Sequence, residues 1–283
     1  MKQRGERIAA MTAYDYTSAQ IIDAAGVHLI LIGDTLGVVV QGADTTVRVS
    51  LEDVIYHACM VARGSQRALL VADMPFMTYQ VSQARALRNA ARLISQGGVG
   101  AVKIEGGDAT VCMTVERLVR AGIPVCGHLG YTPQSAHALG RPRVQARRPN
   151  DALALIHQAQ ALESAGIFAL VLELIPECVA REITDRTRVP TIGIGAGVHC
   201  DGEIQVFHDL FGLYMNFMPR HTHRYLSGAE LIGRAASQYV SDVVARRFPG
   251  PAQSSDLSPQ ARSELELLLR PVLSEGDSFK SPG

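Results

Sequence analysis

The stretch LILIGDTLG (residues 29–37) decides the fold, because it joins an apolar strand to an acid at its end. Four consecutive large aliphatic residues are typical of a parallel strand covered on both faces, and Asp34 follows them after one glycine. The pattern recurs in LLVADMPF (69–76), AVKIEGG (101–107) and ALVLELIP (169–176), which deliver Asp73, Glu105 and Glu173. The repetition indicates parallel strands whose C-terminal ends carry carboxylates.

Short β-type runs alternate with helix-type segments along most of the chain. This alternation predicts a (β/α)₈ TIM barrel built as a single domain, and an open doubly wound sheet is the structural alternative because it uses the same alternation. We expect eight strands, at about residues 7–13, 28–33, 69–73, 101–105, 124–128, 169–173, 190–194 and 212–217.

Helix boundaries are marked by capping residues. Ser50 with Asp53 forms a capping-box pattern, and Ser82 and Asn150 can cap two later helices. Glycines before the following strands are expected to end helices in the left-handed conformation, namely Gly26, Gly97, Gly122 and Gly166.

The composition changes after residue 250. The segment GPAQSSDLSPQARS (250–263) is rich in Pro, Ser and Ala, which is typical of a linker, and ELELLLRPVL (264–273) could form a short amphipathic helix. We therefore predict a catalytic barrel over residues 1–250 and a C-terminal linker and mobile tail over 251–283, without a catalytic part.

Composition favours small-molecule partners. The 283 residues carry 27 basic and 27 acidic side chains, so the formal net charge is zero. The chain therefore has no excess of positive charge that would attract nucleic acid or a membrane surface. The five scattered cysteines lack a Cys-x-x-Cys pair, as is typical of reduced thiols. No secretory signal and no run near the ~20 apolar residues of a membrane span is visible. We expect a cytoplasmic protein without membrane or nucleic-acid partners.

The strand-end acids predict a divalent metal site. In a (β/α)₈ barrel the C-terminal ends of the strands surround the substrate-binding mouth, so Asp34, Asp73, Glu105 and Glu173 should become neighbours. Crowded carboxylates need a compensating cation, and oxygen ligands with open positions suit Mg²⁺. Any one acid could instead cap a helix or form a surface ion pair. Four at equivalent positions favour a shared site.

A lysine and a spare carboxylate extend this hypothesis to a reaction. Lys103 and Glu105 lie two residues apart and face the same side of a strand, where the lysine can contact a substrate carboxylate or form an ordinary ion pair. Together with a metal, these groups suggest that a 2-oxo acid is chelated and loses a proton next to its carbonyl, giving an enolate. Glu173, the last of the acids in the chain, is the candidate base.

Nine motifs carry a family resemblance over residues 9–250 or so. In order, they are MTAYDYTSA, IGDTLGVVVQG, YHACMVARG, ADMPFMTY, AVKIEGG, PVCGHLGYTPQS, ALVLELIP, PTIGIGAG and DGEIQVFHDLFGL. The chain resembles the ketopantoate hydroxymethyltransferase (3-methyl-2-oxobutanoate hydroxymethyltransferase) family, whose barrel is related to phosphoenolpyruvate mutase and isocitrate lyase. VKIEGG together with GHLGYTPQS is the most specific part of the match.

The resemblance implies the transfer of a hydroxymethyl group from 5,10-methylenetetrahydrofolate to 3-methyl-2-oxobutanoate. The product is ketopantoate, a precursor of pantothenate and coenzyme A, and the route is Mg²⁺-stabilised enolate chemistry. The resemblance also implies a large homo-oligomer, commonly a decamer.

The resemblance assigns roles to the site residues. Asp34, Asp73 and Glu105 would serve the Mg²⁺ directly or through water, and Glu173 would remove the C3 proton. Asp34, Thr35, Asp73 and Lys103 would contact the oxo acid, and Thr35 replaces the family's usual serine, so its extra methyl narrows the substrate pocket. His128 would hold or protonate the substrate oxygen, although a histidine there could equally be a hydrogen-bonded wall residue.

Two alternatives stay open at this point. A carbon–carbon lyase of the same barrel superfamily would carry a cysteine loop of the KKCGH type, and the sequence contains none. A catalytically silent paralogue that acts as a binding subunit is disfavoured by the intact acids, but loops 136–148 and 216–225 depart from the family pattern. Turnover with both substrates would separate the transferase from the silent paralogue.

Overall fold

The computed structural model describes residues 1–275, and within them eight parallel strands close into a barrel. Each strand pairs with the next one along the chain, and β8 closes the ring against β1. The predicted (β/α)₈ TIM barrel is therefore confirmed, and the open sheet is excluded. The strands are β1 (Ile8–Thr12), β2 (Leu29–Ile32), β3 (Leu69–Asp73), β4 (Ala101–Glu105), β5 (Val125–Gly130), β6 (Ala169–Glu173), β7 (Thr191–Ile194) and β8 (Gly202–Gln205).

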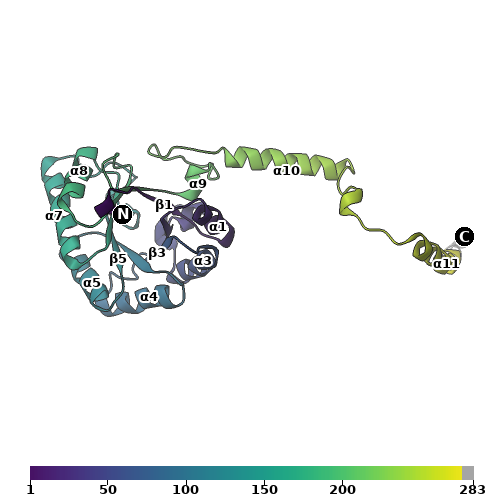
Figure 1. The fold of residues 1–283 in the computed structure, drawn as a ribbon, viewed down its shortest axis with the longest axis horizontal. Helices are drawn as coiled ribbons and strands as arrows, with labels where there is room; N and C mark the ends of the chain where they lie inside the picture. The colour runs from purple at the N-terminus through teal and green to yellow at the C-terminus, as the bar shows by residue number, and fades with distance from the viewer. Residues whose placement is uncertain (276–283) are drawn as a thin grey trace, which may run out of the picture. The chain divides into compact units, whose positions relative to one another are not determined.

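Helices connect the strands and form the outer ring seen in Figure 1. The ring consists of α1 (Tyr16–Ala24), α3 (Leu51–Gly64), α4 (Gln83–Ser95), α5 (Ala109–Arg120), α7 (Pro149–Ala165) and α8 (Glu177–Arg186). Shorter helices lie in the connections after β2, β5 and β8, namely α2 (Leu36–Val39), α6 (Ala136–Leu139) and α9 (Phe207–Leu210). Because every ring helix packs on the barrel, the strands are buried on both faces over most of their length.

The predicted helix boundaries are largely confirmed. Ser50 and Asp53 form a reciprocal capping box, and the Ser82 side chain accepts a hydrogen bond from Arg85 N. The predicted cap at Asn150 is wrong, because α7 begins at Pro149, whose missing N–H needs no acceptor in the first turn. Three of the four predicted glycine ends have a positive φ, whereas after α4 this conformation falls on Gly98 and not on Gly97.

The eighth strand was predicted at 212–217, and this prediction is wrong, because the strand lies at Gly202–Gln205. Ile204 packs inside the barrel, whereas Glu203 and Gln205 on the outer side are half-buried. A strand with a polar outer face lacks the continuous apolar run that marks strands covered on both faces. The apolar run FGLYMNF (211–217) instead follows α9 without forming a strand, and Met215 and Phe217 are exposed.

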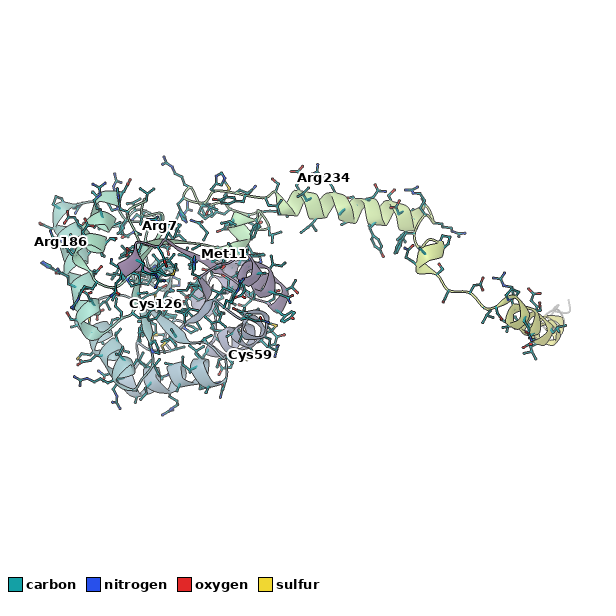
Figure 2. The ribbon with its side chains drawn as sticks, in the orientation of Figure 1. Arg7, Met11, Cys59, Cys126, Arg186 and Arg234 are labelled. Carbon is teal, nitrogen blue, oxygen red and sulfur yellow. The ribbon has the colours of Figure 1, made fainter. Side chains whose placement is uncertain are left out.

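Side chains that point into the barrel change from apolar to polar toward the C-terminal strand ends. Along β4 the inward positions are Ala101, Lys103 and Glu105, in agreement with the period of two in a strand. The apolar layer includes Cys126, which Figure 2 shows inside the ring, while Cys59 lies on the outer side on α3. The barrel is thus a packed core that opens into a polar mouth.

The unit that holds the barrel ends at Gly228, and residues 229–275 belong to a second unit. The second unit contains most of α10 (Gly228–Val244) and α11 (Pro259–Glu275). The division predicted at residue 250, with a mobile and non-catalytic segment 251–283, stays a prediction, and residues 276–283 lie outside the described residues.

The described chain offers no membrane-spanning helix, and its thiols are free. Within residues 1–275 every helix is too short or too polar to cross a bilayer. The five cysteines are all unbridged, and Cys126 and Cys200 are buried.

Gly130 allows the ends of β5 and β6 to approach closely. It has a φ of 98°, and a Cβ at this position would lie 2.1 Å from the carbonyl oxygen of Glu173. That carbonyl also accepts a hydrogen bond from Tyr131 N at 2.8 Å. The close approach therefore fixes the backbone that presents Glu173.

Replacement of Gly130 by alanine should lower the free energy of unfolding by about 3 kcal/mol, from left-handed strain plus the clash with Glu173. Gly26→Ala is the matched control, since Gly26 has a φ of 91° and no atom within 4 Å of an added Cβ. It should lose only about 1 kcal/mol. Urea denaturation measures both, and equal losses would show that the close approach contributes nothing.

Candidate functional site

One pocket at the C-terminal ends of the strands contains every residue of the predicted site. Its empty space is about 420 Å³, including the part that is open to solvent. The predicted site residues that line it are Asp34, Thr35, Asp73, Lys103, Glu105, His128 and Glu173. The structure therefore brings together acids that are far apart in the sequence, as predicted.

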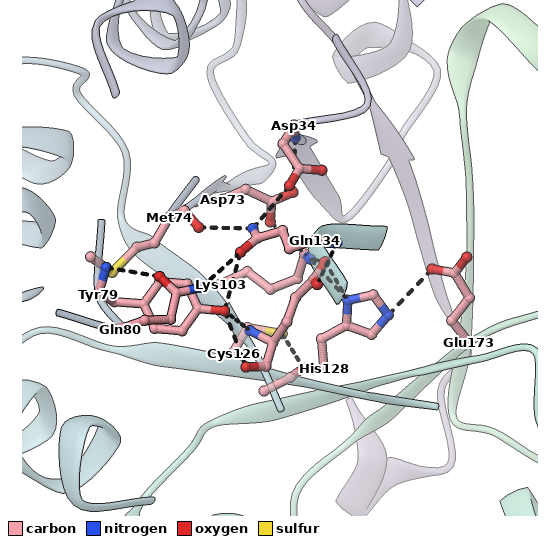
Figure 3. A network of polar contacts seen from close by, with 12 residues as sticks. Asp34, Asp73, Met74, Tyr79, Gln80, Lys103, Cys126, His128, Gln134 and Glu173 are labelled. Atoms are coloured by element: carbon pink, nitrogen blue, oxygen red, sulfur yellow. Dashed lines mark hydrogen bonds and ion pairs between the residues drawn. The ribbon is translucent and has the colours of Figure 1, made fainter. Parts of the chain in front are cut away.

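Lys103 lies at the centre of a buried charge network (Figure 3). Its Nζ is 2.9 Å from Asp73 Oδ1 and 4.0 Å from Glu105 Oε1, and its side chain is only 5% exposed. Burial alone would lower the pKa of this ammonium group, but the carboxylates of Asp73, Glu105 and Asp34 raise the pKa above its ordinary value. Lys103 is therefore charged at neutral pH.

His128 connects this network to Glu173. Burial, reinforced by the charge of Lys103, lowers the pKa of the imidazole, so the ring is neutral. Lys103 Nζ donates to His128 Nδ1 at 3.1 Å, which places the ring proton on Nε2. Nε2 lies 3.3 Å from Glu173 Oε2, and a dashed line joins the two side chains in Figure 3. A neutral ring thus separates Glu173 from the buried ammonium and carboxylate groups.

Each of the three buried carboxylates has one oxygen held by the protein. Asp34 N donates to Asp73 Oδ2 at 2.9 Å, and Gln134 donates to Asp34 Oδ2 at 2.9 Å and to Glu105 Oε2 at 3.0 Å. The second oxygens of Asp73 and Glu105 make no hydrogen bond, although both are buried; Asp73 Oδ1 has only its ion pair with Lys103. Buried acceptor oxygens of this kind require a cation or a proton.

The electrostatics of the cluster lead to the same requirement. Burial raises the pKa of Asp34 well above its ordinary value, and repulsion from Asp73 and Glu105 raises it further. Burial also raises the pKa of Glu105 to about 7, and the attraction of Lys103 only partly offsets this increase. One ammonium group does not balance three carboxylates, so the cluster favours the uptake of protons or of a further cation.

The sequence did not predict Thr12 and Gln205, which line the pocket, or Tyr79 and Gln134, which contact the buried cluster. Gln134 contacts two carboxylates, and the single hydroxyl hydrogen of Tyr79 is shared between the Glu105 carbonyl at 3.1 Å and Gln134 Oε1 at 3.2 Å. Tyr79 and Gln134 each lie in a loop that follows a barrel strand, within the motifs ADMPFMTY and TPQS, respectively. The acids were found by looking for charged side chains at strand ends. The same search, extended to uncharged polar side chains in the loops after the strands, could have found Tyr79 and Gln134.

Comparisons with known proteins identify the family. The model of the ketopantoate hydroxymethyltransferase family matches residues 1–251. The chain belongs to that family. A 3-methyl-2-oxobutanoate hydroxymethyltransferase of Chloroflexus aurantiacus is 52% identical over 92% of this chain and 91% of its own length. Another from Roseiflexus sp. is 53% identical over 94% and 95%, respectively.

Solved structures of other enzymes share the fold of this ketopantoate hydroxymethyltransferase family member. A phosphonopyruvate hydrolase aligns with a TM-score of 0.57 at 14% identity, over 98% of this chain and 96% of that one. A 2,3-dimethylmalate lyase, described as a PEP mutase/isocitrate lyase superfamily member, aligns with a TM-score of 0.54 at 18% identity, over 98% and 95%. The predicted family and the enzyme class, a hydroxymethyltransferase of pantothenate biosynthesis, are confirmed, and these solved structures share the barrel fold.

The raised pKa of Glu105 predicts a pH-dependent stability in metal-free buffer. Because the folded-state pKa of about 7 exceeds the ordinary value of 4.5, the folded protein binds the extra proton between these values. Stability should therefore fall as the pH rises from 4.5 to 7 and change little above it. In EDTA, Glu105→Gln should reduce this fall by roughly 2–3 kcal/mol.

Urea denaturation at pH 4.5 and pH 8 measures the effect. The control is Glu52→Gln on the outer side of α3, where the pKa is lowered through its hydrogen bond with Arg92. This control should keep the wild-type pH dependence. An unchanged pH dependence in Glu105→Gln would mean that the Glu105 carboxyl titrates as it does in the unfolded chain.

Proposed function

We propose that the chain transfers a hydroxymethyl group from 5,10-methylenetetrahydrofolate to 3-methyl-2-oxobutanoate, with Mg²⁺ at the buried carboxylates and Glu173 as the base. Family membership supports the reaction class. The separation of Glu173 from the buried carboxylates is the observation that supports the mechanism most strongly. Its side chain is 16% exposed, whereas those of Asp73 and Glu105 are 3% exposed, so one acid stays free to act on a substrate.

The buried residues fit a hard divalent cation. Asp34, Asp73 and Glu105 present oxygen ligands; Asp73 Oδ1 forms an ion pair with Lys103, and Glu105 Oε1 is buried without a hydrogen bond. Within residues 1–275, no three acidic, histidine or cysteine side chains are placed so that all of them could hold one metal ion directly. Mg²⁺ commonly uses only one or two carboxylates and completes its shell with waters and substrate oxygens. We therefore infer that some of the three acids act through water.

A structure of the same fold gives a precedent for such a ligand set. A phosphonopyruvate hydrolase, 16% identical with a TM-score of 0.55, forms a complex with oxalate and Mg²⁺. For this chain the support comes from its own carboxylates. When bound there, Mg²⁺ supplies a Lewis acid that polarises the 2-oxo group of the substrate.

The surrounding side chains would bind and orient the oxo acid. Lys103 is the buried cation that can attract the substrate carboxylate, and Thr35 adds a hydroxyl at the pocket wall. Asp34 and Asp73 border the same pocket, so they can contact substrate as well as metal. His128 carries its proton on Nε2 and can donate to either a substrate oxygen or Glu173. In this arrangement the substrate C3 would lie toward Glu173.

The position of Glu173 beside the substrate C3 determines the proton transfer. Glu173 Oε2 accepts the C3 proton, and the electrons of the C3–H bond move toward the 2-oxo oxygen. Lys103 stabilises the negative charge that develops beside it. Water cleaves both carbon–nitrogen bonds of the one-carbon unit of the folate, which frees tetrahydrofolate and leaves the carbon at the level of formaldehyde. C3 forms the new carbon–carbon bond to this carbon, and its oxygen takes up the proton from Glu173 to become the hydroxyl of the hydroxymethyl group. Tetrahydrofolate leaves as the second product.

We further propose that the chain works as a homo-oligomer, by family resemblance a decamer, in the cytoplasm. Helix α10 exposes several apolar side chains, which is unusual for a surface that stays in water. They are Leu231, Ile232, Tyr239, Val240, Val243 and Val244. The free cysteines fit a reducing compartment.

The proposed base can be tested without the folate. In ²H₂O with Mg²⁺, the wild-type protein should exchange the C3 proton of 3-methyl-2-oxobutanoate for deuterium. Glu173→Gln keeps the size of the side chain but cannot accept the proton, so its exchange rate should fall at least about 100-fold. Proton NMR measures the exchange, and Glu177→Gln at the start of α8 is the control that should retain it.

Three results would distinguish the possibilities. Wild-type-like exchange in Glu173→Gln would assign the base elsewhere. Exchange that is unaffected by EDTA would remove the metal from the mechanism. Exchange by the wild type without turnover of 5,10-methylenetetrahydrofolate would indicate a protein that activates the oxo acid but has lost the transfer.

A further inference from the structure

We propose that Gln134 is a positioning residue for the metal-binding carboxylates and that it couples metal binding to the conformation of the loop after β5. The inference rests on the Mg²⁺ site proposed above and adds a residue that does not itself bind the ion. Gln134 lies in the 3-10 turn Pro133–Ser135, and its side chain is buried, with only 4% of the residue exposed.

The side-chain amide of Gln134 is held in one orientation. Its Nε2 donates to Asp34 Oδ2 and to the Met74 carbonyl, both at 2.9 Å. Its Oε1 accepts from the Tyr79 hydroxyl at 3.2 Å and from Gln80 Nε2 at 3.4 Å (Figure 3). Both amide hydrogens and the carbonyl oxygen are therefore used, and a flipped amide would place Oε1 against the Asp34 carboxylate and the Met74 carbonyl.

The backbone of the same residue orients a second carboxylate. Gln134 N donates to Glu105 Oε2 at 3.0 Å, which leaves Oε1 of Glu105 as the oxygen without a hydrogen bond. One residue thus selects which oxygen of Asp34 and which oxygen of Glu105 remain for a cation. Groups that orient metal ligands in this way commonly change metal affinity 10–100-fold when they are removed.

The loop that carries Gln134 is attached again on the other side of the pocket. Gln145 N donates to the Leu174 carbonyl at 2.7 Å, directly after Glu173, and the Tyr131 hydroxyl donates to the Gly140 carbonyl at 3.4 Å. The segment therefore runs from the buried carboxylates to the proposed base. If Gln134 stabilises the metal-binding geometry, a bound ion must by reciprocity stabilise the anchored loop.

Calorimetric titration of the full chain with Mg²⁺, alone and with 3-methyl-2-oxobutanoate, tests the first part. Gln134→Met matches the length of the side chain without its hydrogen bonds, and Gln134→Asn keeps an amide that no longer reaches Asp34. Both should bind Mg²⁺ at least about 10-fold more weakly than the wild type. Gln145→Leu is the matched control, because the hydrogen bond of its side chain goes to the Arg143 carbonyl and not to a carboxylate of the site. Circular dichroism and Tm identify variants that fail to fold.

Trypsin tests the coupling through the loop. Arg143 and Arg147 are exposed and are not followed by proline, so trypsin can cleave after them. Mg²⁺ with the oxo acid should slow this cleavage severalfold in the wild type and in Gln145→Leu, but not in the folded Gln134 variants. This readout depends on loop exposure and needs no turnover.

The results separate this inference from the function proposed above. If the wild type binds Mg²⁺ and folded Gln134 variants bind it equally well, Gln134 is only a structural residue and the inference is wrong. If ligand protects the loop equally in the Gln134 variants, the coupling is wrong. If the wild type itself binds no Mg²⁺ under either condition, the proposed metal site fails and this inference fails with it.

Discussion

The burial of three carboxylates beside one ammonium group is the constraint on which the rest of the site depends. Asp34, Asp73 and Glu105 lie at the mouth of a closed barrel, where water cannot fully solvate them, and Lys103 compensates only part of their charge. The barrel tolerates this arrangement because hydrogen bonds hold one oxygen of each acid. We propose that a divalent ion balances the charge that remains.

The same charge balance explains how neighbouring acids can have different roles. The carboxylates around Lys103 are buried and restrained, whereas Glu173 lies on the far side of a neutral histidine and is partly exposed. A fully buried Glu173 would join the repulsive cluster, and a distant one could not reach the substrate. The Gly130 backbone, which contacts the Glu173 carbonyl, helps to fix the intermediate position.

Particular residues show how far the sequence predicts this structure. Apolar runs that end on an acid locate β2, β3, β4 and β6 and their carboxylates, because both features follow from local burial and strand direction. The position of β8 was predicted wrongly, because Glu203 and Gln205 interrupt the apolar pattern of this strand. Gln134 was not predicted, because its role depends on contacts with Glu105 and Asp34, which lie 29 and 100 positions earlier in the chain. No local sequence pattern indicates such contacts, because only the folded barrel brings these residues together.

Anomalous diffraction from crystals grown with Mn²⁺ and 3-methyl-2-oxobutanoate would test the central claim most directly. Mn²⁺ prefers the same oxygen ligands as Mg²⁺ and can be located by its own scattering. The account predicts one strong peak among the Asp34, Asp73 and Glu105 carboxylates, with the oxo acid between the ion and Glu173. A peak at another site, or no peak with these carboxylates in their present hydrogen bonds, would contradict it.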